Sequence, residues 1–244
     1  MGEAFLWGAF GGAALILGAA AALWLPIDKR VVGMVMALGA GVLISAVAFD
    51  LVEEAVNTAD GEGGVALGLA AGALTFFVGD TLIDRMGGDK RKSMAGGAKA
   101  EGSGLAIVLG AVLDGIPESI VLGMSLLAGA GVSVAFVAAV FISNLPEGLA
   151  ATSGLTESGW STARILGLWT GVTLVSATSA LLGFGVFDGA SAGVTAFVLA
   201  YAGGAVLTML ADTMMPEAFA QAGPLVGLFT TAGFAVAFGL HMIE

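Results

Sequence analysis

The chain has 244 residues, of which 58% are hydrophobic and only 11% are charged, with a mean hydropathy of +1.01 and a net charge of −11. Soluble domains carry Asp, Glu, Lys and Arg at about a quarter of their positions, so this composition excludes an ordinary soluble protein. Cysteine is absent, which excludes disulfides, thiolate metal sites and cysteine nucleophiles.

Long apolar stretches follow one another along the chain. A membrane-spanning helix needs about 20 mostly apolar residues. Eight windows qualify and predict an all-α membrane protein with one transmembrane domain over residues 1–244. In chain order the windows are 4–25, 32–54, 63–83, 104–128, 132–157, 162–186, 190–213 and 223–243. The N-terminus has no basic stretch, so we expect the first window to be a spanning helix and not a cleaved signal.

The basic residues all fall in connections on one side of the membrane under this count. They are Lys29, Arg30, Arg85, Lys90, Arg91, Lys92, Lys99 and Arg164. By the positive-inside rule these connections are cytoplasmic, and both termini are outside. The longest connection, residues 84–103, is rich in glycine and basic side chains and predicts a cytoplasmic loop between the third and fourth helices.

Two of the windows carry acidic side chains near their middle, where a carboxylate is costly unless it is paired, hydrated or bound to a cation. The groups are Asp114, Pro117 and Glu118 in the fourth window, and Ser143, Asn144, Pro146 and Glu147 in the fifth. The first polar residue and the glutamate are four apart in each window, so they project from one helix face. The prolines free backbone carbonyls that water or an ion can satisfy. Matching interrupted helices of this kind point to the binding site of a transporter, here for a cation.

Further acids lie toward the ends of two other windows. Asp50 and Glu54 are near the predicted outer surface, and Asp212 and Glu217 are near the predicted inner surface. Together with the middle group they outline a route for a cation. The alternative is that Asp50 and Glu54 are headgroup-level residues and that Asp212 and Glu217 are structural.

These stretches together resemble the ZIP (Zrt/Irt-like protein) family of divalent metal transporters. Residues Asn144–Ala150 match that family's Asn-x-Pro-Glu-Gly core, and Ile116–Glu118 match the counterpart on the fourth helix. The resemblance covers essentially the whole chain. It implies eight transmembrane helices in a three-plus-two-plus-three bundle, both termini outside, and a metal site on the fourth and fifth helices. We also expect an inverted repeat to relate the first and last three helices.

The chain departs from that family where histidines are usual. The substituted positions are Asp50, Asp114, Ser143 and Asp212, while Gly115 replaces an asparagine and Ser176 stands where some members have a glutamate. The resemblance implies a first metal site of Asp114, Glu118, Ser143 and Glu147, with Asn144 and Glu147 in what remains of a second. Oxygen ligands favour harder ions, but zinc also binds carboxylates, so we expect zinc, manganese and iron all to be accepted.

The expected function is therefore divalent metal transport. The ion would pass Asp50 and Glu54, bind between the fourth and fifth helices, and leave past Asp212 and Glu217. The alternative is a ZIP-fold membrane protein that binds or senses a metal without carrying it; metal flux into vesicles separates the two.

Other expectations concern activity, partners and location. We expect no enzyme activity, no cofactor besides the metal substrate, no nucleic-acid partner, membrane lipid around the helices, and a cell-membrane location; a homodimer stays open. No lysine lies at membrane depth to hold retinal, and no histidine lies in the core to assist a hydrolase nucleophile. The one histidine, His241, is expected to be an interfacial residue and not a ligand.

Overall fold

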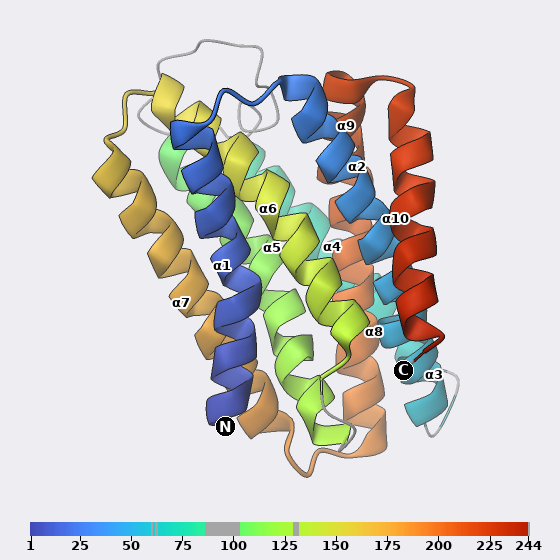
Figure 1. The fold of residues 1–244 in the computed structure, drawn as a ribbon. Coiled ribbons are helices and arrows are strands. Elements are labelled where there is room, and N and C mark those ends of the chain that lie inside the picture. Colours follow the sequence, from blue (N-terminus) through green and yellow to red (C-terminus); the bar gives the residue numbers. More distant parts are fainter. Residues whose placement is uncertain (60, 62, 86–102, 129–131, 244) are drawn as a thin grey trace.

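The computed structural model describes residues 1–59, 61, 63–85, 103–128 and 132–243, and every regular element in these ranges is helical (Figure 1). In chain order the elements are α1 (Gly2–Trp24), α2 (Lys29–Ala46), the π-helical turn η1 (Val47–Glu53), α3 (Glu54–Thr58), α4 (Gly63–Arg85), α5 (Ser103–Ser125), the 3-10 turn η3 (Leu126–Ala128), α6 (Val134–Glu157), α7 (Thr162–Phe187), α8 (Ala192–Met209), the π-helical turn η4 (Leu210–Met214), α9 (Met215–Ala222) and α10 (Leu225–His241). Of the predicted cytoplasmic loop, residues 86–102 lie outside the described residues, with Lys90, Arg91, Lys92 and Lys99.

The helices have the length and composition of membrane spans. Among the described residues, seven are long and apolar enough to cross a bilayer, and α10 is a shorter apolar helix of 17 residues. The span Lys29–Thr58 runs through α2, η1 and α3, and the span Ala192–Ala222 runs through α8, η4 and α9. The predicted all-α, multi-span chain is confirmed, and each of the eight predicted windows overlaps a helix.

The end of the seventh predicted window is wrong. That window ends at residue 213, but its span continues to Ala222, beyond Pro216. A proline inside a regular α-helix clashes with the preceding turn and removes a hydrogen bond. Here the wider turn η4 precedes Pro216, and the altered hydrogen-bond pattern lets the chain continue. Asp212 is therefore ten residues, or roughly 15 Å, from the end of its span at Ala222, and so further from that end than predicted.

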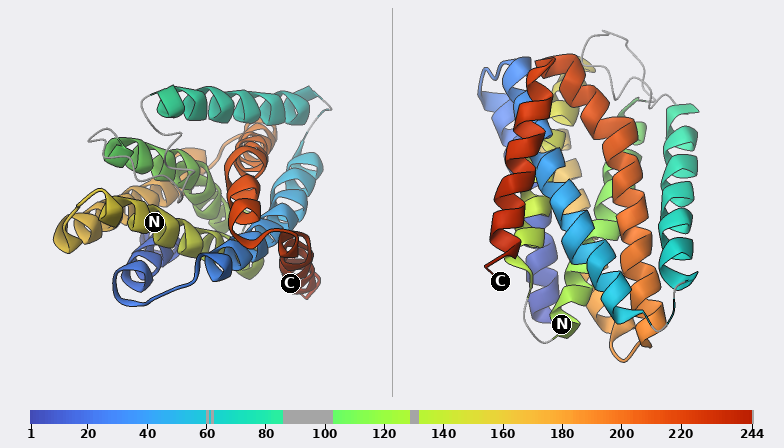
Figure 2. Two further views of the ribbon diagram at one scale, coloured as in Figure 1. Left: turned by 90° about the horizontal axis from the view of Figure 1, so that it is seen from above. Right: turned by 90° about the vertical axis from the view of Figure 1, so that its right-hand side faces the viewer.

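The helices pack in two groups, seen along the bundle in Figure 2. In one group α1 packs on α6 and α7, and α5 packs on α7; in the other α2 packs on α10 and α9, and α4 packs on α8. Contacts of α2 with α6 and of α5 with α8 join the groups. The two termini lie at the same end of the bundle (Figure 1). The space between the groups is where the candidate site is found.

Facing glycines bring four helix pairs into close contact. Where α1 crosses α6, a Cβ on Gly18 would collide with the carbonyl oxygen of Leu145, and a Cβ on Gly148 would collide with that of Leu15. The same reciprocal arrangement joins α2 to α10, α4 to α8 and α5 to α7, through Gly41 with Gly233, Gly72 with Gly204, and Gly123 with Gly183. Lipid tails are as apolar as the helix side chains, so the hydrophobic effect does not drive helices together in a bilayer. Close packing of backbones through small residues does so instead.

Buried hydrogen bonds fix α1 against its neighbours. Asn144 Nδ2 of α6 donates to the Gly11 carbonyl at 3.1 Å, and Thr173 Oγ1 of α7 donates to the Gly12 carbonyl at 2.9 Å. Each such bond contributes about 0.6 kcal/mol in a membrane protein. The bond from Asn144 holds α6, which carries the Pro146-Glu147 pair, beside α1, and the bond from Thr173 holds α7 there.

Candidate metal-binding site

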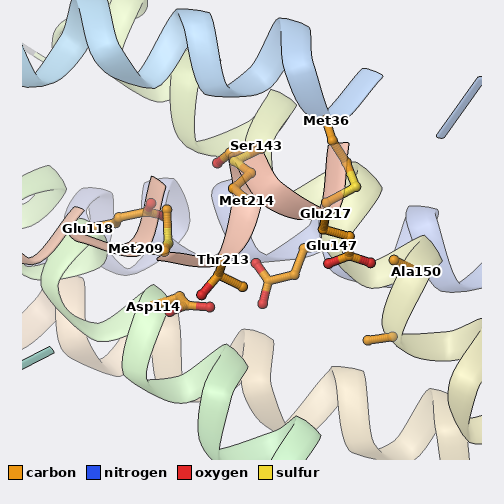
Figure 3. Close-up of a pocket in the computed structure, with 11 residues that line it drawn as sticks. Met36, Asp114, Glu118, Ser143, Glu147, Ala150, Met209, Thr213, Met214 and Glu217 are labelled. Carbon is orange, nitrogen blue, oxygen red and sulfur yellow. The ribbon is translucent and has the colours of Figure 1, made fainter. Parts of the chain in front are cut away.

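A cavity of about 60 Å³ lies between the two helix groups, which is enough room for an ion with a few water molecules (Figure 3). Its wall is formed by Met36, Asp114, Glu118, Ser143, Glu147, Ala150, Ala151, Met209, Thr213, Met214 and Glu217. Carboxylates and hydroxyls thus reach one space from α5, α6, η4 and α9. No Lys or Arg is among the residues that form this wall.

The acidic residues of the cavity come from the two helices with internal prolines. Asp114 lies half-way along α5, with Glu118 one turn further on, and their exposed fractions are only 8% and 2%. Glu147 lies near the middle of α6. Figure 3 shows Asp114 and Glu147 pointing toward the centre of the cavity. Deep carboxylates that face a shared space are the arrangement expected for an ion pathway in a membrane protein.

The acidic side chains are not close enough together to coordinate one ion directly. Within the described part of the chain, no three Asp, Glu or His side chains are arranged so that they could hold a metal directly. The Oε2 atom of Glu118 and the Oγ1 atom of Thr213 are buried without a hydrogen-bond partner. Oxygen atoms in that state are available to a cation, which would complete its coordination with water.

Ser143 and Asn144 occupy different positions although they are adjacent. Ser143 lies on the cavity wall, and its Oγ donates to the Val140 carbonyl at 3.0 Å, which leaves the oxygen lone pairs to accept or coordinate. Asn144 is not part of the wall, and its Nδ2 is bound to α1. The structure therefore brings together four of the five predicted ligands: Asp114, Glu118, Ser143 and Glu147.

Of the two acids predicted near the inner surface, Glu217 and Asp212, only one lines the cavity. Glu217 lines the cavity, whereas Asp212 is exposed on the outside of its helix. Thr213, which the sequence analysis missed, lines the cavity one turn before Glu217. The reason is η4: a π-helical turn has more than the usual 3.6 residues per turn and rotates the following face. Pro216 follows this turn, but Pro117 and Pro146 lie inside α5 and α6 without a π-helical turn, so the proline alone does not reveal it.

Three methionines complete the wall: Met36, Met209 and Met214. They come from α2, α8 and η4, opposite the acidic helices, and all three are buried. Their apolar side chains limit water in the cavity, and their thioether sulfurs are soft, weak ligands.

A small polar side chain of α7 lies beside α5 at Gly115. Ser176 is buried on α7, and a Cβ added to Gly115 of α5 would lie 3.3 Å from Ser176 Oγ. Gly115 and Ser176 therefore face each other, and the Ser176 hydroxyl is the side-chain group between the two backbones.

A second, larger cavity of about 720 Å³ lies at the end of the bundle where the termini are. Asp50 and Glu54, the predicted outer-mouth residues, both line it. His241 lines it as well and faces Asp50. His241, which was expected to be an interfacial residue and not a ligand, thus lies at the end of α10 beside a carboxylate.

The fold and the cavity define an all-helical, multi-span membrane protein with an acidic cavity within the bundle. No protein-family model matches the chain. The chain is 26% identical over 215 residues to an Arabidopsis thaliana protein named "Putative zinc transporter", and the match covers 87% of this chain and 34% of that protein. The chain thus spans about a third of the length of the curated relative it matches.

Proposed function

We propose that the protein carries divalent metal cations across a membrane and binds them in the central cavity. The observation that carries the proposal is the convergence of six oxygen-bearing side chains on one buried space, which no lysine or arginine among the described residues lines. They are Asp114, Glu118, Ser143, Glu147, Thr213 and Glu217. So many acids at membrane depth require a compensating positive charge, and a divalent cation supplies it. Similarity to a protein named as a zinc transporter supports the same function.

Zinc, manganese and iron are the proposed substrates. Carboxylate, hydroxyl and water oxygens suit manganese, and zinc binds carboxylates at about 2.0–2.2 Å. Zinc usually outcompetes manganese for a given set of ligands, so zinc should bind most tightly of these two. Glu118 and Glu147 would be the principal ligands, with Asp114 and Ser143 as further ligands; Asn144, the fifth predicted ligand, lies outside the cavity wall.

The arrangement of the helices within the bundle is proposed from the resemblance to ZIP proteins. We infer a three-plus-two-plus-three bundle with an inverted repeat. Support comes from the matching π-helical turns, each with an aspartate (Asp50 and Asp212), in the second and seventh spans. Further support comes from paired packing: α4 on α8 matches α10 on α2, and α7 on α5 matches α1 on α6.

The proposed route crosses the membrane between the two helix groups. The metal would enter the outer cavity past Asp50 and Glu54, bind in the central cavity, and leave past Glu217. We infer both termini outside and a cell-membrane location from the distribution of basic residues. Alternating exposure of the central cavity to the two sides requires movement of one helix group relative to the other.

Zinc flux into proteoliposomes tests the proposal. We expect Glu147→Gln to abolish flux, because it removes a carboxylate ligand while it keeps side-chain volume. Glu157→Gln is the matched control: it is the same substitution on the same helix, at an exposed position at its end. Wild-type protein that binds zinc but shows no flux would favour the alternative, a metal-binding or sensing membrane protein.

A further inference from the structure

The second cavity, of about 720 Å³, is called the outer cavity. It is lined by two side chains of types that bind metals, Asp50 and His241, which are far apart in the sequence. Asp50 is on η1 of the second span, and His241 is the last residue of α10. The distance from His241 Nδ1 to Asp50 Oδ1 is 3.7 Å, and the two side chains are 33% and 13% exposed. They are therefore reachable from the cavity but are largely surrounded by protein.

Asp50 is held in place by Ser133, which precedes α6. The Ser133 hydroxyl accepts from the Phe136 backbone N–H at 3.0 Å, as the N-cap of α6, and donates to Asp50 Oδ1 at 3.0 Å. The bond that caps α6 uses a lone pair of the Ser133 oxygen, so the single hydroxyl proton of Ser133 can be donated to the carboxylate. This bond orients Asp50 toward the cavity in the manner of the outer-shell partners of metal-binding carboxylates.

His241 is held by an aromatic ring. Its imidazole stacks on Phe49, with ring centroids 5.2 Å apart and 27° between the planes. Phe49 also contacts Phe234 and Phe238 of α10, so the helix end and the π-helical turn form one packed unit. The imidazole is thereby kept beside the carboxylate.

We propose that Asp50 and His241 form an outer binding site for a divalent metal such as Zn²⁺, separate from the central cavity. Zinc bonds of about 2.0–2.2 Å to nitrogen and to carboxylate oxygen allow one ion to bridge two atoms that are 3.7 Å apart. The identity of the ion as cargo rests on the proposed function. Since no triad of His, Asp or Glu among the described residues could hold a metal directly, water completes the coordination, and the cavity of about 720 Å³ has room for it.

This site adds a selectivity that the all-oxygen central cavity lacks. Imidazole favours zinc and neighbouring transition metals over magnesium and calcium, which prefer oxygen. Glu54 and Asp188 lie on the same cavity wall and add negative potential, which raises the local concentration of any cation without discriminating. The outer site thus captures a hydrated ion with few protein ligands and can release it inward.

The test uses the fact that the chain has one histidine. Diethyl pyrocarbonate converts imidazole to carbethoxyhistidine, so formation of that product in the purified protein, measured apart from adducts of other side chains, reports on His241 alone. We expect Zn²⁺ to slow the modification and Mg²⁺ at the same concentration to leave it unchanged. Asp50→Asn should raise the zinc concentration that gives half-protection at least tenfold, on the order of the loss seen when a supporting group of a metal ligand is removed.

Two control variants make the outcome decisive. Asp188→Asn removes one charge from the same cavity wall without touching His241, and it should change the half-protecting concentration only about two-fold, because solvent and salt screen exposed charges. Glu147→Gln alters the central cavity and should leave the protection unchanged. Absence of zinc protection in the wild type, or equal effects of Asp50→Asn and Asp188→Asn, would overturn the outer site.

The outcomes also separate this site from the proposed function. Zinc flux without protection of His241 would mean that transport is correct and the outer site is wrong. Protection of His241 in a protein without flux would mean that the outer site is correct and the carrier proposal is wrong.

Discussion

Thr213 is a residue of the central cavity with a buried polar atom that lacks a hydrogen-bond partner. Its Oγ1 is buried with no hydrogen-bond partner, whereas the hydroxyl of Ser143 donates to the Val140 carbonyl. An unsatisfied buried hydroxyl lowers the stability of the empty protein by about 1–3 kcal/mol. The same oxygen gains a partner when a cation occupies the cavity, so Thr213 should link metal binding to stability.

Thr213→Val should therefore have opposite effects on the empty and the loaded protein. Valine has nearly the same shape, so we expect the thermal stability of the metal-free protein to be unchanged or higher. Zinc affinity should fall about five-fold, equivalent to about 1 kcal/mol for a lost oxygen contact. Calorimetric titration and thermal unfolding measure the two quantities, and Thr213→Ser is the control that retains the hydroxyl. A parallel loss of stability and affinity would indicate a packing role only.

The positions that the sequence predicted well are those that depend on regular helical spacing. Asp114 with Glu118 and Ser143 with Glu147 are each four residues apart on α-helices, and all four line the cavity. Asp212 was predicted on the path, but it is exposed because η4 rotates the helix face. Asn144 was assigned by resemblance, and its bond to the α1 backbone depends on a contact 133 residues away that no local pattern reveals.

At the scale of elements, the crossing of α1 and α6 is what holds the site. Gly148 follows Glu147 directly, and its α-carbon faces the Leu15 carbonyl of α1, while Gly18 of α1 faces the backbone at Leu145 and Leu149. Any side chain added at this crossing must separate the helices, since the atoms in the way belong to the backbone. The position of Glu147 therefore depends on two glycines.

Gly18→Ala should destabilise the protein by about 1–3 kcal/mol, the usual cost of overpacking. Gly171→Ala on α7 is the matched control, because a Cβ there meets no atom within 4 Å. Alanine favours helix over glycine by up to about 1 kcal/mol, so the control should be neutral or stabilising. Thermal unfolding in detergent compares them. Equal effects of the two substitutions would show that the crossing is not tight.

The existence of each span was predictable, but its internal irregularities were not. Apolar length alone predicted the helices, because a backbone in lipid must satisfy its own hydrogen bonds. The π-helical turns at Val47–Glu53 and Leu210–Met214 have no such compositional signal. They depend on packing between spans, as does the pairing of Asp50 with His241, which are 191 positions apart in the printed sequence.

At the scale of the whole molecule, the orientation in the membrane decides the direction of the proposed path. The termini and the large cavity lie at one end of the bundle, and Arg30 and Arg164 lie in the first turns of α2 and α7 at the other. Arg164 also stacks on Trp160, 3.7 Å from the ring centroid, as expected of residues at a membrane interface. We infer that the cavity end faces outward.

The cysteine-free chain allows a direct test of this orientation. A membrane-impermeant maleimide added to intact cells should label Glu3→Cys, at the N-terminal end of α1. It should label Glu157→Cys, at the opposite end of α6, only after permeabilisation. The reverse pattern would place the basic connections outside and reverse the path.

The central claim is that one metal ion binds among the acids of α5 and α6, and anomalous X-ray scattering from zinc-loaded crystals tests it most directly. The account predicts a zinc peak inside the cavity, within coordination distance of Glu118 or Glu147 and bounded by Asp114 and Thr213. Zinc peaks found only elsewhere in crystals diffracting well enough to place the carboxylates, with the cavity lacking a peak, would contradict it.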